Sequence, residues 1–112
     1  VIMGLDGGKE TESFRRENIA PFIKRAYSPS GITCFTASGC ASVPLCLTAS
    51  GKLHAYMALS LEPWDMAATV AINREAGAKV TDMHYKEWEV GDESILVANP
   101  ILHKKLYNLL II

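Results

Sequence analysis

Short apolar runs alternate with longer amphipathic segments along the chain. Apolar runs bounded by Gly, Pro, Ser and Asn predict buried strands, and we expect these at residues 1–3, 32–35, 54–59, 79–82 and 94–98. Apolar residues at helical spacing predict helices at residues 10–27, 38–49, 63–76 and 100–110. A turn-rich, hairpin-like segment around residues 87–90 separates the last two strands.

Glycine and proline mark the expected boundaries. The Gly-rich stretch at residues 4–8 predicts a turn, and Pro21 is expected to kink or divide the first helix. Pro44 fits a helix because it lies near the first turn. Gly51 and Gly77 are expected to end the helices that precede them.

This alternation of strands and helices predicts the α/β class, with a layered mixed β-sheet flanked by helices. The 112 residues fit one domain of ordinary size, and we find neither an internal repeat nor a low-complexity linker. We therefore expect residues 1–112 to form a single α/β domain. The apolar fraction of 49% suffices for a packed core.

Charge and cysteine content narrow the possible partners. The net charge of -1 gives no attraction to nucleic acid or to an anionic membrane, so we predict neither as a partner. No apolar run approaches the roughly 20 residues that span a bilayer. Cys34, Cys40 and Cys46 are odd in number and lie among apolar neighbours. They are read as buried, reduced thiols, which predicts a cytoplasmic protein.

Two predicted helix starts are candidate sites. Asp65 follows Pro63 and Trp64 at the beginning of an alanine-rich helix. A carboxylate held there suits a hard cation, and its favourable interaction with the helix dipole is the alternative reading. At the other start, residues 38–42 offer small side chains and free backbone N–H groups. Such a start binds phosphate, although simple capping by Ser38 is the alternative.

The three histidines carry less information. His54, His84 and His103 lie in different predicted elements and show no metal-ligand spacing. They are predicted to face solvent or to be satisfied within the core rather than to bind a metal.

Five short motifs, taken in order, resemble those of the inositol monophosphatase family. This family belongs to the superfamily of Mg²⁺-dependent, lithium-sensitive-type sugar phosphatases. The motifs are Gly39-Cys40-Ala41-Ser42, Ala49-Ser50-Gly51-Lys52-Leu53-His54-Ala55-Tyr56, Pro63-Trp64-Asp65-Met66-Ala67-Ala68, Glu75-Ala76-Gly77-Ala78-Lys79-Val80-Thr81-Asp82 and Val97-Ala98-Asn99-Pro100. The similarity extends from about residue 31 to residue 110, and the Trp-Asp element followed by Glu-Ala-Gly is its most specific part.

The resemblance implies the C-terminal half of a layered α/β phosphatase that hydrolyses a small-molecule phosphate ester with Mg²⁺. It implies that Asp65 is a metal ligand and that Gly39, Cys40 and Ala41 approach the substrate. The family's other ligands come from a Glu and an Asp-Pro-x-Asp-Gly-Thr-like element upstream, which this sequence does not contain. We therefore expect a missing N-terminal half of the same protein as a partner, no complete catalytic set in this chain, and an inactive fragment.

Four positions depart from the family pattern. Thr69 and Tyr85 replace usual glycines, and Cys40 replaces a common hydroxyl residue. Ala58 stands where inositol-selective members carry a Glu that contacts the substrate, which weakens the case for inositol.

Several functions therefore stay open. The leading prediction is an inositol phosphate or related sugar phosphate as substrate, with fructose-bisphosphatase and nucleotide-bisphosphate phosphatase activity as alternatives. A non-catalytic scaffold that keeps the fold, or an unrelated α/β binding domain, are the other readings. Because a short chain this apolar leaves apolar surface exposed, we also expect a homo-oligomer.

Overall fold

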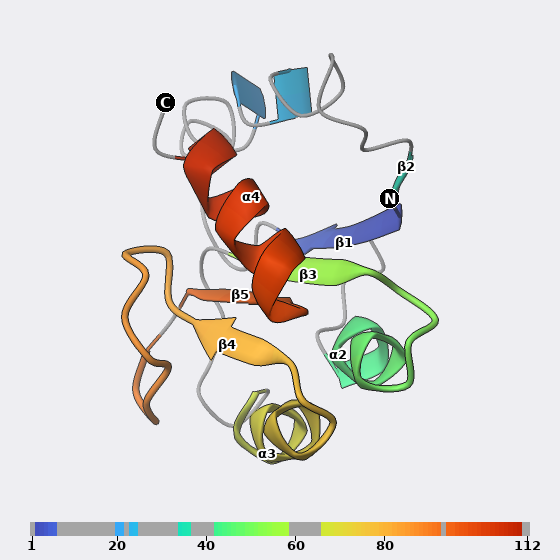
Figure 1. Cartoon of the computed structure of the whole chain (residues 1–112), viewed down its shortest axis with the longest axis vertical. Coiled ribbons are helices and arrows are strands. Elements are labelled where there is room, and N and C mark those ends of the chain that lie inside the picture. The colour runs from blue at the N-terminus through green and yellow to red at the C-terminus, as the bar shows by residue number, and fades with distance from the viewer. Residues whose placement is uncertain are drawn as a thin grey trace.

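The structure is a computed structural model of the whole chain (Figure 1). It describes residues 2–6, 20, 21, 23, 24, 34–36, 42–58, 66–92 and 94–110. Residues 20, 21, 23 and 24 are helical, and the remainder of the first predicted helix lies outside the described residues.

The described strands form one mixed sheet in the order β2-β1-β3-β5-β4. These strands are β1 (Ile2–Asp6), β2 (Cys34–Thr36), β3 (Ala55–Ala58), β4 (Lys79–Thr81) and β5 (Ile95–Ala98). β1 pairs in parallel with both β2 and β3, and β5 lies antiparallel between β3 and β4. β1, β2, β3 and β4 therefore all point the same way, and only β5 is reversed among the described strands.

Helices cover both faces of the sheet (Figure 1). α2 (Ser42–Ala49) and α3 (Ala67–Glu75) pack side by side on one face, and α4 (Pro100–Leu110) lies across the other. Side chains along β3 alternate between the two layers, as the pleat of a strand requires. Met57 joins the core under α4, whereas Tyr56 joins the core under α2 and α3.

Close packing at Gly4 brings α2 down onto β1. A Cβ atom at this position would lie 2.8 Å from Cδ1 of Tyr56 and 3.3 Å from Cβ of Pro44. The absence of a side chain at residue 4 thus lets the Tyr56 ring and the first turn of α2 approach the strand.

Most predicted elements are confirmed. Each of the described strands overlaps a predicted one, and Pro44 lies in the first turn of α2. Gly51 and Gly77 follow α2 and α3 with φ angles of 81° and 88°, the left-handed geometry that glycine tolerates. Asn99 caps α4, since its Oδ1 accepts a hydrogen bond of 2.9 Å from the backbone N–H of Leu102.

Three predictions were wrong in part. The turn was predicted at residues 4–8, but residues 4–6 pair with β3 and belong to β1, so the predicted start is too early. Cys46 is exposed rather than buried, because it lies on the outer side of α2. The strand predicted at residues 32–35 is not buried on both sides as expected, since Phe35 is half-buried and Thr36 is exposed at the edge of the sheet.

Candidate functional site

The direction of the strands creates one edge at which the chain repeatedly leaves the sheet to enter a helix. β2 ends at Thr36 and leads to α2, and β3 ends at Ala58 and leads to α3. Because these strands are parallel, both connections start from the same edge, which we call the carboxyl edge. Ligands of open α/β sheets bind characteristically at this edge.

The predicted site residues lie outside the described residues, but their neighbours in the chain do not. α2 begins at Ser42, directly after Gly39, Cys40 and Ala41. α3 begins at Ala67, two residues after Asp65, and the structure therefore begins this helix later than residue 63. Both helices run away from the carboxyl edge, so their amino ends, with unpaired backbone N–H groups, belong to that edge.

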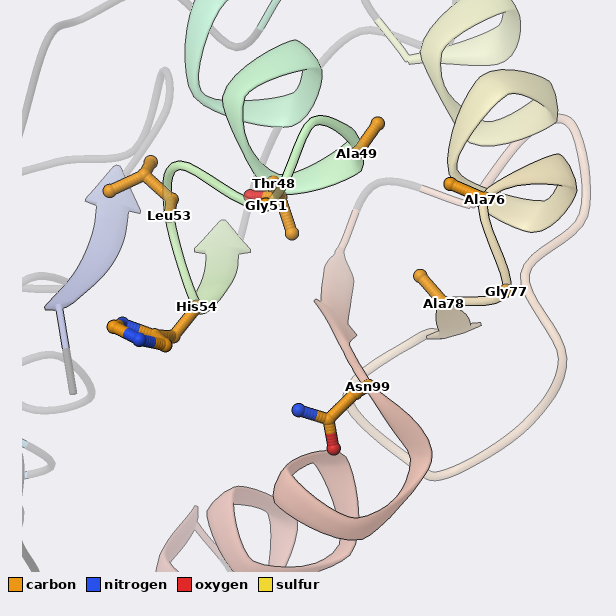
Figure 2. Close-up of a pocket in the computed structure, with 9 residues that line it drawn as sticks. All are labelled: Thr48, Ala49, Gly51, Leu53, His54, Ala76, Gly77, Ala78 and Asn99. Carbon is orange, nitrogen blue, oxygen red and sulfur yellow. The ribbon is translucent and has the colours of Figure 1, made fainter.

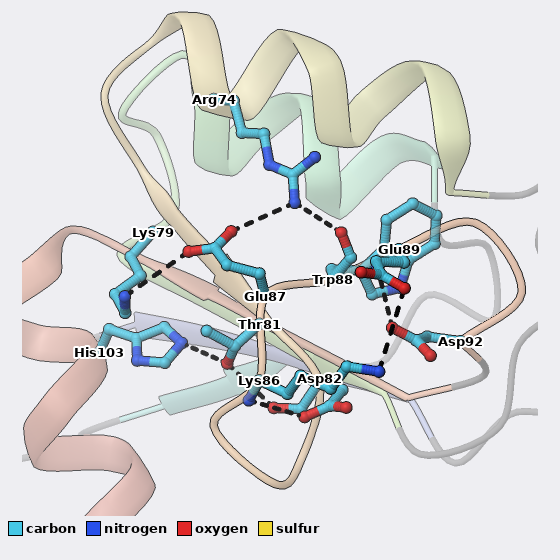
Figure 3. Close-up of polar contacts among 10 residues, drawn as sticks. All are labelled: Arg74, Lys79, Thr81, Asp82, Lys86, Glu87, Trp88, Glu89, Asp92 and His103. Atoms are coloured by element: carbon cyan, nitrogen blue, oxygen red, sulfur yellow. Dashed lines mark hydrogen bonds and ion pairs between the residues drawn. The ribbon is translucent and has the colours of Figure 1, made fainter.

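The described side chains at this edge do not form a magnesium site. Among the described residues no three His, Cys, Asp or Glu side chains are grouped so as to hold a metal. Asp82 follows β4, but its Oδ1 already accepts hydrogen bonds from the backbone N–H groups of His84 (2.8 Å) and Lys86 (3.0 Å). This carboxylate closes a turn and is not arranged as a ligand (Figure 3). The described donors alone therefore do not fit Mg²⁺, which needs several oxygen ligands.

A cavity of about 310 Å³ opens at the opposite edge of the sheet (Figure 2). The ends of α2 and α3 and the starts of β3 and α4 line it with mostly small side chains. His54 and Asn99 are its largest polar side chains, and Nδ1 of His54 accepts a 2.9 Å hydrogen bond from the backbone N–H of Ile2. Sequence reasoning did not single out this cavity, which lies away from the carboxyl edge.

A polar network fastens the segment between β4 and β5 to α3 (Figure 3). The Arg74 guanidinium donates a 2.6 Å hydrogen bond to the carbonyl of Trp88 and lies 3.4 Å from Glu87. Lys79 reaches the same carboxylate at 3.8 Å. The hairpin predicted near residues 87–90 is a turn-rich loop here, with one isolated bridge between Thr81 and Glu87.

His103 is the buried histidine of the three, and of its two ring nitrogens only Nε2 has a partner at hydrogen-bond distance among the described residues. It is fully buried, and its Nε2 lies 2.8 Å from Oγ1 of Thr81 (Figure 3). Burial, reinforced by the positive charge of Lys79, lowers the pKa of His103 below its ordinary value near 6.5. The Leu96 carbonyl and Glu87 oppose that shift. The neutral imidazole therefore acts as a structural group between α4 and the sheet, whereas His54 and His84 are exposed.

Tyr85 packs against this histidine in a strained backbone conformation. Its φ angle is 65°, a region that favours glycine, which accounts for the glycine that the family usually has at this position. The ring lies edge-on to His103 at 5.4 Å and to Tyr107 at 4.7 Å between centroids, and Lys79 lies 5.3 Å from the ring centre.

A mixed sheet with α2 and α3 both starting from one edge defines a layered α/β protein, a class in which ligands characteristically bind at the carboxyl ends of the strands. Comparison with known sequences is decisive about the family. The chain belongs to the inositol monophosphatase family, whose sequence model matches residues 5–111.

Two relatives and one solved structure illustrate this membership. Phosphatase IMPL1, chloroplastic, from Arabidopsis thaliana is 47% identical over 68 residues, covering 61% of this chain and 18% of the relative. Putative Nus factor SuhB from Neisseria meningitidis is 40% identical over 62 residues, covering 55% and 24%. The structure of inositol monophosphatase from Anabaena has a TM-score of 0.81 at 26% identity and covers 98% of this chain and 42% of its own.

The chain thus spans less than half the length of each of these proteins. None of the helices in the described part of the chain combines the length and apolar character needed to cross a bilayer.

Proposed function

We propose that this chain forms the C-terminal part of a Mg²⁺-dependent phosphomonoesterase that acts on an inositol phosphate or a related sugar phosphate. Family membership supports phosphatase chemistry. The observation that carries the proposal further is the convergence of the amino ends of α2 and α3 on the carboxyl edge, each adjoining one of the two predicted site segments.

In this proposal Asp65 supplies one oxygen ligand to Mg²⁺, and Gly39, Cys40 and Ala41 contact the phosphate ester through backbone N–H groups at the start of α2. A helix start suits a phosphate because its N–H groups are unpaired and carry the positive end of the helix dipole. Bound Mg²⁺ would supply charge neutralisation and an activated water. The described residues alone hold no group of three metal-binding side chains, and the remaining ligands in this proposal come from an N-terminal half of the same protein, as the resemblance to the family implies.

The substrate within this class depends partly on residue 58. Ala58 is fully buried at the end of β3 and packs in the core under α2 and α3. A methyl group here offers no polar contact to an inositol hydroxyl. Fructose bisphosphate and a nucleotide bisphosphate are therefore included as test substrates beside inositol phosphate.

Phosphate release by the complete protein that contains this chain tests the proposal. Inositol monophosphate, fructose bisphosphate and a nucleotide bisphosphate are each assayed with Mg²⁺ and with EDTA. We expect Mg²⁺-dependent release from at least one ester and none from the 112-residue chain alone. Equal release with EDTA would overturn the metal dependence, and a fully active 112-residue chain would overturn the shared site.

The second candidate is a non-catalytic scaffold that retains the fold. The relative called Putative Nus factor SuhB favours it, since its name describes no phosphatase activity. A folded complete protein that binds Mg²⁺ but hydrolyses none of the esters would support this function instead.

The cytoplasmic location and the homo-oligomer remain predictions of the sequence. Sedimentation of the complete protein at several concentrations tests the second, and we expect a dimer or larger assembly. A monomer at every concentration would contradict it.

A further inference from the structure

Asn73 links the two helices whose amino ends meet the candidate site. Its side chain is completely buried on α3. The Nδ2 amide donates a 3.0 Å hydrogen bond to the carbonyl of Leu45 on α2 and a 2.8 Å hydrogen bond to the carbonyl of Thr69 in its own helix. One nitrogen therefore bridges α2 and α3.

The chemistry of the bridge requires an amide. Two carbonyl oxygens face the same atom, and a primary amide can supply two hydrogens from one nitrogen. The reversed amide would place an oxygen against two acceptors, which fixes its orientation. Oδ1 of Asn73, however, is buried with no partner among the described residues, which costs free energy that an apolar side chain would not incur. The bridge is therefore made at a cost in stability that an apolar side chain would not incur.

The two acceptors stand at equivalent places relative to the candidate site. Leu45 follows Ala41 by four residues, and Thr69 follows Asp65 by four residues. Each carbonyl thus belongs to the first turn of its helix, one turn beyond a predicted site segment. A bond between these turns restricts how far apart the two amino ends can lie.

The other contacts between these helices are less directional. Leu45, Met66 and Val70 share one apolar cluster, and apolar contacts tolerate sliding of one helix along its neighbour. The hydrogen bonds of Asn73 fix a direction as well as a distance.

We propose that Asn73 is a positioning residue that sets the separation between the amino ends of α2 and α3. This inference rests on the proposed function, in which those ends hold Asp65 on one side and Gly39, Cys40 and Ala41 on the other. Asn73 touches neither metal nor substrate, and it acts by keeping the metal ligand and the phosphate-binding backbone in register. A displacement of about 1 Å at a catalytic site can lower the rate by about 100-fold.

The test compares Asn73→Leu with Asn108→Leu in the complete protein. Asn108 is exposed on α4, so the same chemical change there serves as the control. We expect Asn73→Leu to remain folded, with a thermal midpoint equal to or above that of the wild type, because it removes the unpaired Oδ1. Its KM and the Mg²⁺ concentration for half-maximal rate should each rise at least about tenfold, while the control stays within twofold.

A second variant, Asn73→Asp, keeps the shape of the side chain and makes the bridge depend on pH. The ionised carboxylate donates no hydrogen, whereas the protonated acid donates one. The ratio of the variant's KM to the wild-type KM should therefore fall as the pH falls. A purely structural role would change the thermal midpoint and leave this ratio constant, and that result would overturn the proposal.

Unchanged KM and Mg²⁺ dependence in a folded Asn73→Leu variant would also overturn it. If Asn73→Leu does not fold, the pH dependence of Asn73→Asp decides. If the wild-type protein hydrolyses no ester, the proposed function is wrong, and this result says nothing about whether Asn73 positions the two helices. In that case crystal structures of the wild type and the folded variant decide the positioning role: displaced amino ends of α2 and α3 support it, and superimposed ends overturn it.

Discussion

The two edges of the sheet differ in what they offer a ligand. The carboxyl edge receives the amino ends of α2 and α3 and adjoins the two segments with family motifs. The opposite edge has the cavity of about 310 Å³ formed where those helices end, lined largely by alanine, glycine, threonine and leucine. We therefore expect the phosphatase chemistry at the carboxyl edge, whereas the cavity of about 310 Å³ lies at the opposite edge.

In a chain that covers less than half of its relatives' length, a cavity among the described residues and the predicted site need not coincide. A site shared between two halves of a protein has its wall missing when one half is considered alone. The described residues that line the cavity at the opposite edge all come from the ends of α2 and α3 and from the starts of β3 and α4.

The strongest test of the difference between the two edges is the substitution Asp65→Asn in the complete protein. The change removes a negative charge from the proposed metal site but keeps the shape of the side chain. We expect phosphatase activity to fall by about 100-fold or more, since even the partners of metal ligands contribute 10- to 100-fold. The thermal midpoint should change little, because loss of the helix-dipole interaction costs at most about 1 kcal/mol. Turnover within threefold of the wild type would show that Asp65 is structural.

Gly4→Ala tests the packing that holds α2 against the sheet. The added methyl group would lie 2.8 Å from Tyr56 and 3.3 Å from Pro44, so one of them must move. We expect a loss of about 1–3 kcal/mol in the free energy of unfolding, measured by urea denaturation. Val43→Ala, an exposed change on the same helix, is the control and should cost much less. Equal losses would mean that α2 is not closely packed on β1.

The pH dependence of stability tests the role of His103, which is buried between α4 and the sheet. The folded pKa of His103 lies below its unfolded value near 6.5, so the unfolded state takes up the proton first. The contribution of His103 to stability is therefore fully present above this value and is lost as the pH falls below about 6.5. One such group contributes at most about 1.4 kcal/mol per pH unit.

His103→Leu should flatten this decline, measured by chemical denaturation at a series of pH values. Thr81 keeps a partner in the variant, because its hydroxyl also donates to the carbonyl of Asp82. His84→Gln is the matched control, because His84 is exposed, and it should leave the decline in place. A decline that persists unchanged in His103→Leu would assign it to other groups.

The smallest effect is expected at the opposite edge. His54→Ala enlarges the cavity and removes the 2.9 Å hydrogen bond from Ile2. The free energy of unfolding should fall by about 1 kcal/mol, while kcat/KM for the phosphate ester stays within twofold. A tenfold fall in kcat/KM with an intact fold would move the chemistry to this edge and contradict the comparison.

Sequence patterns predicted most of the architecture because they act locally. Apolar runs and helical spacing located the described strands and helices, and Gly51 and Gly77 marked two helix ends. The error at residues 4–6 arose because a local glycine signal was read as a turn, although pairing with β3 keeps the segment extended. Propensity is a weak guide where a neighbouring strand supplies the hydrogen bonds.

For the candidate site, motif order was sufficient to identify Asp65 and residues 39–41 as candidates, and their roles remain predictions. Motifs could not reveal Asn73, because an asparagine in a helix that contains Thr69 and Val70 has no distinctive local signal. Its role appears only when Leu45, 28 residues earlier, is brought within 3.0 Å.

The sequence by itself therefore determined the fold class, the family and the presence of the two helices that adjoin the candidate site segments, although not the residues at which these helices begin. These properties follow from short-range patterns of apolar residues, glycines and motif spacing. The tertiary structure alone decided the sheet order, the burial of His103 against Thr81 and the bridge from α3 to α2. The physical reason is that pairing register and buried hydrogen bonds join residues distant in sequence, so no local pattern encodes the partner.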